Sequence, residues 1–209
     1  TLHLGILSPL RSWGYFPLNP NMEVYCNQGG FGIDGNMSSL LGASLVNPNN
    51  IYYGVVGDLS FFYDMNVLGN HHVNRNVRIM LINNSLGAEF HLFKQTNTNN
   101  VNDIDKYISA GGHFGKQSPV VVKYLAENWG YEYLCASTKE EFNSVYDRFL
   151  TPEMTEKPMI FEVFTDVKSE NDALYKIYNI EVSQETVFKR VIKGIVGEKV
   201  VNAVKKIVK

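Results

Sequence analysis

Two short apolar runs on either side of a helical segment constrain the fold of this chain more than any other feature. The runs, Ile51–Val56 and Val77–Ile82, end at the polar pairs Gly57–Asp58 and Asn83–Asn84. This succession predicts a β-strand, a helix and a second β-strand parallel to the first. Ligands of open parallel sheets bind beyond the carboxyl ends of the strands, so the polar pairs mark the expected binding edge. The residues that indicate the intervening helix are Phe61, Met65, Leu68 and His72.

The groups at this edge suit a metal-bound diphosphate. Asp58 supplies a charged oxygen and Asn84 a neutral one, and with a nearby main-chain carbonyl they match the octahedral oxygen shell of Mg²⁺. Gly57 allows a sharp turn out of the strand. The helix that begins near Leu59–Ser60 directs free N–H groups at the same space, where they favour phosphate. From these residues alone an alternative stays open, in which Asp58 is a helix N-cap and Asn83–Asn84 an ordinary turn.

The spacing of the two pairs resembles the cofactor motif of thiamine-diphosphate enzymes, which joins Gly-Asp-Gly to Asn-Asn through a helix and a strand. Leu59 stands in place of the third-position Gly, and the form Gly-Asp-Leu-Ser followed by Asp64–Asn66 is similar to the subgroup of the menaquinone-pathway SEPHCHC synthase and acetolactate synthase. A second block, Asn27–Gly35, resembles the same subgroup. The resemblance implies the C-terminal cofactor-binding domain of such an enzyme, an α/β fold of three α-β-α layers with a mostly parallel sheet.

The resemblance also implies roles for single residues. Mg²⁺ would be held by Asp58, Asn84 and the main-chain carbonyl of Leu86. Ile33 would bend thiamine diphosphate into its V shape, and the Phe31 carbonyl would accept a hydrogen bond from the aminopyrimidine. The residues that the resemblance assigns to cofactor binding are Phe31, Gly32, Ile33, Gly57, Leu59, Ser60, Gly87 and Phe90.

Four residues are candidates for acid–base or metal chemistry. Glu89 is a candidate catalytic proton-transfer group if burial raises its pKa, and the alternative is a surface acid in the first turn of a helix. His71 and His72 are adjacent on the predicted helix and point about 100° apart, so they are not expected to share a metal ion. We expect His72 in the core or an interface. His113 lies in a Gly-rich segment typical of a lid, with an ordinary solvated loop residue as the more frequent alternative.

Two positions bear on the substrate. The subgroup has Arg where this chain has Gln28, and an amide cannot form the charged, bidentate contact that Arg makes with a carboxylate. The resemblance therefore implies a 2-oxo acid decarboxylase or carboligase whose substrate differs from that of the menaquinone enzyme. Arg11, which follows Ser8, resembles a substrate-contacting Ser and Arg at a spacing one residue shorter. A solvent-facing Arg on a helix is the alternative.

The rest of the chain predicts alternating helices and strands, as a three-layer parallel sheet requires. A helix over Leu2–Trp13 is expected to be interrupted near Ser8–Pro9, and Asp34 is expected to cap a helix over Asn36–Val46. Further on, Ser137 or Thr138 is the expected cap of a helix. The remaining predicted elements are the strands Glu23–Cys26, Tyr131–Cys135 and Met159–Phe164 and the helices Pro119–Trp129 and Lys139–Phe149.

Composition restricts the broad class. The 209 residues are 44% hydrophobic and carry a formal charge of −2, which allows one well-formed core and gives no indication of nucleic-acid binding. Cys26 and Cys135 adjoin apolar runs and are expected as buried, reduced thiols of a cytoplasmic protein. No apolar run is long enough to cross a bilayer. Residues 1–180 are predicted to form the cofactor-binding domain, and residues 181–209 a basic amphipathic helical tail.

The chain starts without Met inside helical-looking sequence, so we expect a piece of a longer polypeptide. The resemblance implies that the glutamate that activates the cofactor lies on another domain. It also implies that this piece alone is inactive, and that the full site forms at a subunit interface of a homodimer or homotetramer acting on a 2-oxo acid. A different class of function stays open, namely a non-catalytic module that binds a nucleotide or diphosphate for regulation or assembly.

Overall fold

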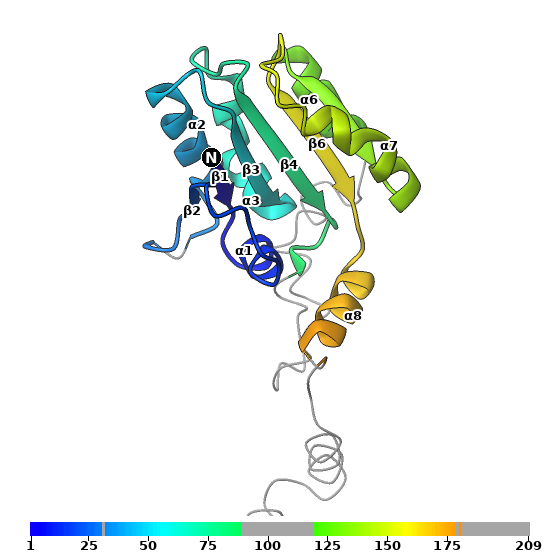
Figure 1. Cartoon of the computed structure of the whole chain (residues 1–209). Helices are drawn as coiled ribbons and strands as arrows, with labels where there is room; N and C mark the ends of the chain where they lie inside the picture. Colours follow the sequence, from blue (N-terminus) through cyan, green and yellow to red (C-terminus); the bar gives the residue numbers. More distant parts are fainter. Residues whose placement is uncertain (31, 89–118, 179, 181–209) are drawn as a thin grey trace, which may run out of the picture. The chain divides into compact units, whose positions relative to one another are not determined.

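The computed structural model describes residues 1–30, 32–88, 119–178 and 180 (Figure 1). The chain divides into two compact units, residues 1–171 and 172–209, and the six strands described here all lie in the first. The elements are β1 (Leu2–Leu4), α1 (Ser8–Trp13), β2 (Val24–Cys26), α2 (Asn36–Val46), β3 (Tyr52–Gly57), α3 (Asp58–Asp64), the 3-10 helix η1 (Met65–Gly69), β4 (Val77–Asn83), α6 (Pro119–Asn128), β5 (Glu132–Ala136), α7 (Lys139–Phe149), β6 (Met159–Phe164) and α8 (Val167–Tyr178).

The strands form one sheet in the order β2-β1-β3-β4-β6-β5. Every pair of neighbours is parallel, which confirms the predicted α/β class and makes the described sheet wholly parallel. The order differs from the chain order at one place that matters for the site. Strand β6 lies between β4 and β5, so the last of the described strands pairs with β4.

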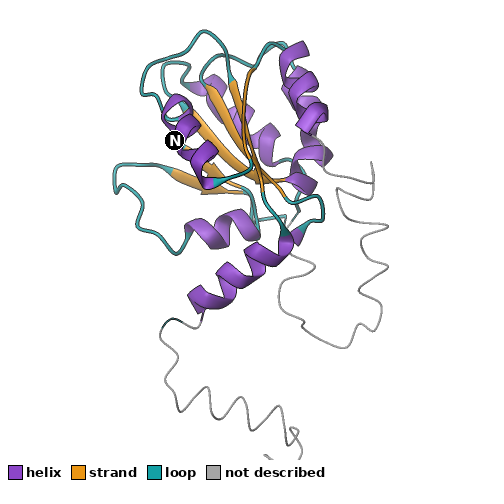
Figure 2. Cartoon of the chain, turned by 90° about the vertical axis from the view of Figure 1, so that its right-hand side faces the viewer, coloured by secondary structure: helices purple, strands orange, loops and turns teal. Residues whose placement is uncertain are grey.

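Helices cover both faces of the sheet and give the predicted three layers (Figure 2). On one face, side chains of α2, α3 and α6 such as Met37, Phe61 and Ala126 pack on the sheet in the largest buried cluster. On the other face, α1 and α7 cover two smaller clusters. Strand β4 contributes side chains to the clusters on both faces of the sheet. Ile79 and Met80 are successive residues, so they point to opposite faces and join different clusters. Burial on both faces explains the nearly unbroken apolar runs of the sequence.

Several predicted elements are confirmed with their bounds. Helices α2 and α7 and strand β6 begin and end at the predicted residues. Thr138 is the N-cap of α7, since its side chain accepts a hydrogen bond from the Glu141 N–H at 3.1 Å. Two of these elements have a sharp signal in the sequence, a capping residue for α7 and an apolar run for β6.

The predicted helix over Leu2–Trp13 is wrong in its first half. Leu2–Leu4 is a strand that pairs with β2 on one side and β3 on the other, and all three of its side chains are buried. Three residues are too few to separate a strand period from a helix period, so the apolar spacing that continues into α1 was misleading. Helix α1 itself starts at Ser8, with Pro9 in the first turn, where no N–H is needed.

Three local predictions are also wrong. Gly35, with a φ of 75°, occupies the N-cap of α2 instead of Asp34, and no side chain caps that helix. The core position expected for His72 is wrong, because the helical segment ends at Gly69 and the exposed His71 and His72 follow in a turn, whereas the alternative, an interface, stays a prediction. Their rings approach to 3.8 Å, yet the described residues contain no group of three His, Cys, Asp or Glu that could hold a metal. Cys135 is exposed, and Cys26 is half-buried.

Candidate functional site

The two polar pairs meet at the carboxyl edge of the sheet, as the sequence predicts. Strands β3 and β4 are parallel neighbours, and Gly57 pairs with Ile82. The chain therefore leaves both strands at the same level, with Asp58 beginning α3 and Asn84 beginning the turn after β4. Parallel pairing brings residues that are 26 positions apart into hydrogen-bond contact.

Asp58 is a buried carboxylate with a perturbed pKa. Its side chain is 1% exposed, and its oxygens accept hydrogen bonds from the N–H groups of Leu59 at 2.7 Å and Asn84 at 3.1 Å. Burial raises its pKa to about 6, and the negative charge of Glu170 acts in the same direction. Asp58 is the first residue of α3, and Gly57 is the N-cap, so Asp58 is not the helix cap of the alternative interpretation.

Asn84 is held at both ends of its side chain. Its Oδ1 accepts a hydrogen bond from the Leu86 N–H at 3.0 Å, and its Nδ2 lies 3.1 Å from each carboxylate oxygen of Glu170. The turn that follows has two residues with left-handed backbone, Ser85 and Gly87, with φ values of 67° and 61°. Gly adopts this conformation without strain, which explains its presence in the turn.

The preceding Asn83 is tied into the centre of the sheet. Its Nδ2 donates to Glu162 Oε1 at 2.7 Å, and its Oδ1 accepts from the Ser85 N–H at 3.2 Å. Glu162 is fully buried on β6, and its second oxygen accepts a hydrogen bond from the Tyr133 hydroxyl at 2.6 Å. Burial raises the pKa of Glu162, and the charge of Asp58 contributes in the same direction.

Sequence reasoning missed Glu162 and Glu170. Glu162 had a usable signal, because it is the one charged residue in the apolar strand Met159–Phe164 and a buried charge needs a partner. Glu170 had none, since an acid in the first turn of a helix is ordinary.

The glycine-rich block meets the same edge through Ser60. The Ser60 hydroxyl donates to the Ile33 carbonyl, and Asn36 Nδ2 donates to that carbonyl at 2.9 Å and to Ser60 Oγ at 2.8 Å. Asn27 Nδ2 closes the block by donating to the Gly35 carbonyl at 3.0 Å. A side chain at Gly32 would collide with the Asp34 carboxylate. Ile33 and Ser60, two residues assigned to the cofactor, are thus joined directly.

The remaining predicted site residues divide into two groups. Gly57, Leu59, Leu86 and Gly87 lie at the carboxyl edge beside Asp58 and Asn84, with Leu59 buried. Phe31, Glu89, Phe90 and His113 lie outside the described residues.

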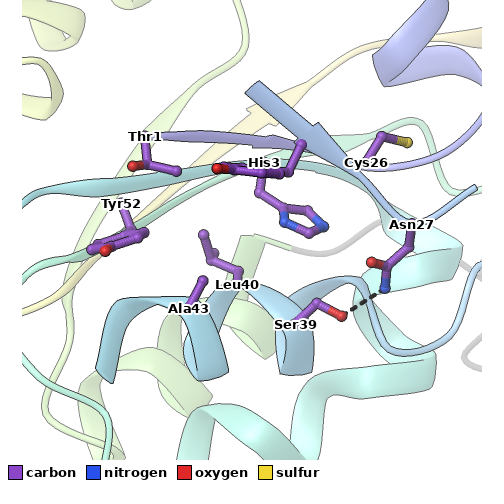
Figure 3. Close-up of a pocket in the computed structure, with 9 residues that line it drawn as sticks. Thr1, His3, Cys26, Asn27, Ser39, Leu40, Ala43 and Tyr52 are labelled. Carbon is purple, nitrogen blue, oxygen red and sulfur yellow. Dashed lines mark hydrogen bonds between the residues drawn. The ribbon is translucent and has the colours of Figure 1, made fainter. Parts of the chain in front are cut away.

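A separate pocket lies between the sheet and α2 (Figure 3). It has a volume of about 270 Å³, and its lining includes His3, Asn27 and Ser39. His3 is buried, its Nε2 has no hydrogen-bond partner among the described residues, and burial lowers its pKa. Among the described residues, no Asp or Glu lines the pocket, and neither Asp58 nor Asn84 reaches it. It is therefore unsuited to a metal-bound diphosphate.

Comparison with known proteins defines the class. The family model of the thiamine pyrophosphate enzyme C-terminal TPP binding domain matches residues 9–163, and the chain belongs to this family. The chain is 33% identical over 178 residues to the 2-succinyl-5-enolpyruvyl-6-hydroxy-3-cyclohexene-1-carboxylate synthase of Phocaeicola vulgatus. The aligned region covers 85% of this chain and 30% of that protein. It is 34% identical over 184 residues to the synthase of the same name from Bacteroides thetaiotaomicron, covering 88% and 31%. The chain thus spans less than a third of the length of these relatives.

The residues at the carboxyl edge fit a diphosphate-bound divalent cation. Asp58 and Asn84 present hard oxygen donors, and Asp58 forms no ion pair with any described Lys or Arg. The buried Ser85 Oγ has no hydrogen-bond partner within the described part of the chain. No described atom outside the neighbouring residues of the chain lies within 4 Å of the point where a Cβ on Gly57 would sit, so a ligand can approach the backbone there.

No helix of the described residues is long and apolar enough to span a membrane.

Proposed function

We propose that this chain binds thiamine diphosphate through Mg²⁺, as the C-terminal domain of a longer 2-oxo acid decarboxylase or carboligase. The observation that carries the proposal is the contact between Asp58 and Asn84, from a Gly-Asp and an Asn-Asn pair, in a chain of the thiamine pyrophosphate enzyme family. Asp58, Asn84 and the Leu86 carbonyl would coordinate the metal. At the start of α3 the Ser60 N–H would bind a phosphate oxygen, and the Leu59 N–H, which donates to Asp58 Oδ1 at 2.7 Å, would have to share its hydrogen between that carboxylate and the phosphate.

The bound cofactor would supply the carbon nucleophile and electron sink for loss of CO₂ from a 2-oxo acid. The protein's contribution is position and charge. The Ile33 main chain is fixed by Ser60 and Asn36, which suits a residue that must press against the cofactor. Phe31, Gly32, Gly57, Gly87 and Phe90 complete the proposed contacts, and Glu89 remains the proposed proton-transfer residue.

The reaction described by the name of the relatives, the synthesis of 2-succinyl-5-enolpyruvyl-6-hydroxy-3-cyclohexene-1-carboxylate, is the first activity to assay. Gln28 stands where the resembling subgroup has a carboxylate-binding Arg, so we propose a substrate that lacks this contact. Helix α1, which carries Ser8 and Arg11, is separated from the carboxyl end of β1 by only three residues and so starts at the same edge as Asp58. Arg11 is therefore the proposed alternative contact for a substrate carboxylate.

A homodimer or homotetramer is the proposed assembly, with the activating glutamate supplied by a partner. Large apolar side chains are exposed between α1 and β2 and on β2 itself, including Phe16 at 65% and Tyr25 at 53%. Such a surface is typical of an interface with another domain or subunit.

Calorimetric titration of thiamine diphosphate, with Mg²⁺ and with EDTA, tests the cofactor assignment. We expect binding only with Mg²⁺, and Asp58→Ala should weaken it about 100-fold or more, because even residues behind metal ligands contribute 10–100-fold. The matched control is Asp147→Ala, an exposed position on α7. Equal binding by Asp58→Ala and the control would refute the metal site, and binding in EDTA would refute the role of Mg²⁺.

A further inference from the structure

Glu170 approaches the proposed metal site from a part of the chain that sequence reasoning did not connect with it. Its carboxylate faces the Asn84 amide, with Nδ2 at 3.1 Å from both Oε1 and Oε2. The position of Glu170 is itself fixed, because the Thr165 hydroxyl donates to Oε1 and the Thr165 N–H donates to the Asn83 carbonyl at 2.9 Å. Asp166 caps the start of α8 by accepting a hydrogen bond from the Ser169 N–H at 2.9 Å.

These contacts determine which end of the Asn84 amide points where. A carboxylate only accepts hydrogen bonds, so Glu170 binds the NH₂ end and directs Oδ1 to the opposite side, where it accepts from the Leu86 N–H. The reversed amide would place Oδ1 against the carboxylate and NH₂ against an N–H group. All of these hydrogen bonds would then be lost. A divalent cation binds an amide through its oxygen and not through NH₂, so this orientation is the productive one.

The neighbouring residue uses the same arrangement. Asn83 donates from Nδ2 to Glu162 and accepts at Oδ1 from the Ser85 N–H. Each amide of the Asn-Asn pair is therefore oriented by one carboxylate, from β6 for Asn83 and from α8 for Asn84. The repetition indicates that amide orientation in this turn is determined by the β6–α8 segment.

We infer that Glu170 is a positioning residue that holds the Asn84 carboxamide with Oδ1 toward the Mg²⁺ of the cofactor. The inference rests on the proposed function for its metal, while the hold on the amide is independent of any cofactor. Glu170 does not need to touch the metal or the substrate. A negative charge near a cation also raises affinity, and the test must separate the two effects.

The cofactor-free test is NMR of the whole protein with ¹⁵N-labelled Asn side chains, the Asn84 signal being identified by its loss in Asn84→Asp. We expect Glu170→Ala to shift this amide signal and to accelerate its hydrogen exchange. Glu170→Gln should preserve most of the protection, because Gln Oε1 still accepts from Nδ2. The matched control, Glu140→Ala, changes an exposed acid in the first turn of α7 and should leave the signal unchanged. An unchanged Asn84 signal in Glu170→Ala overturns the inference.

The second test is the affinity for Mn²⁺, used as an EPR-visible substitute for Mg²⁺, in the presence of thiamine diphosphate. We expect Glu170→Ala to weaken Mn²⁺ binding about 10–100-fold and Glu170→Gln to stay within a few-fold of the wild type. Equal loss in both variants means that Glu170 acts by charge alone, which overturns the positioning role. Failure of the wild type to bind Mn²⁺ would refute the proposed function instead, and the NMR result would then decide whether Glu170 holds the amide.

Discussion

The two ends of strand β4 both hold polar groups inside the protein, and they differ in the sign of the charge and in the groups that compensate it. Near the amino end, Arg78 is fully buried, and its guanidinium donates to the carbonyls of Phe149, Thr151 and Glu153 and to the Tyr53 hydroxyl. At the carboxyl end, Asn83 and Asn84 contact the buried carboxylate of Glu162 and the half-buried carboxylate of Glu170, and neither forms an ion pair with a described Lys or Arg.

The difference separates a structural charge from the charges of the proposed metal site. The charge of Arg78 is spread over main-chain oxygens of the segment after α7, and it joins that segment to β4. At the other end, Asp58, Glu162 and Glu170 form a concentration of negative charge, in which Glu170 raises the pKa of Asp58 and Asp58 raises that of Glu162. A divalent cation would relieve this repulsion, whereas Arg78 needs no ligand.

The largest expected effect comes from removing the structural charge. Arg78→Met should lower the free energy of unfolding by about 3 kcal/mol or more, because it leaves the buried Phe149 carbonyl, two part-buried carbonyls and a hydroxyl without their donor. Urea unfolding of the purified variant measures this loss.

The matched control is Arg148→Met. Arg148 instead bonds a carboxylate, that of Glu132 at 2.6 and 2.8 Å, and does so on the surface, where such pairs contribute less than about 1 kcal/mol. Equal effects of the two substitutions would contradict the distinction between a structural and a surface arginine.

Whether the sequence could predict a contact of the site depends on how many residues separate the two partners along the chain. The Asp58–Asn84 contact was predictable, because a strand, a helix and a strand form a local parallel pair whose carboxyl ends lie together. The contacts of Asn83 and Asn84 with Glu162 and Glu170 span 79 and 86 residues. They depend on β6 pairing with β4, whereas the chain order alone would favour β5 as the neighbour.

The pH dependence of cofactor binding gives the next effect. Asp58 must be ionised to bind Mg²⁺ and its pKa is raised to about 6, so lowering the pH from 7 to 5 should weaken Mg²⁺-dependent binding about tenfold. Calorimetric titrations at both pH values measure this, after correction for the affinity of Mg²⁺ for free thiamine diphosphate at each pH. An affinity that stays constant after this correction would contradict the burial of an ionisable Asp58.

The same pKa predicts the opposite trend for the cofactor-free protein. The folded state binds more protons than the unfolded chain between pH 3.8 and about 6, so the contribution of Asp58 to stability decreases as the pH rises through this range. Urea unfolding of the cofactor-free wild type and of Asp58→Asn should show the steeper decrease in the wild type. Parallel curves would argue against a perturbed carboxylate.

The smallest effect concerns the support of Asn83. Tyr133→Phe removes the hydroxyl that donates to Glu162 at 2.6 Å and should lower the free energy of unfolding by about 1–2 kcal/mol, because a buried carboxylate loses a donor. Tyr131→Phe is the comparison, since its hydroxyl donates to the neutral Leu68 carbonyl at 3.1 Å and should matter less. A larger loss for Tyr131→Phe would mean that the Glu162 network contributes little to the fold.

The insertion of β6 between β4 and β5 also sets an order of events during synthesis. A ribosome that has delivered β3, α3 and β4 has already produced Asp58 and Asn84, but the residues that orient the two amides are still inside the tunnel or untranslated. The edge of β4 must stay open until β6 arrives, and β5 must leave that position unoccupied. The turn proposed to bind the metal therefore forms late, after long-range pairing, although its own residues lie in the first half of the chain.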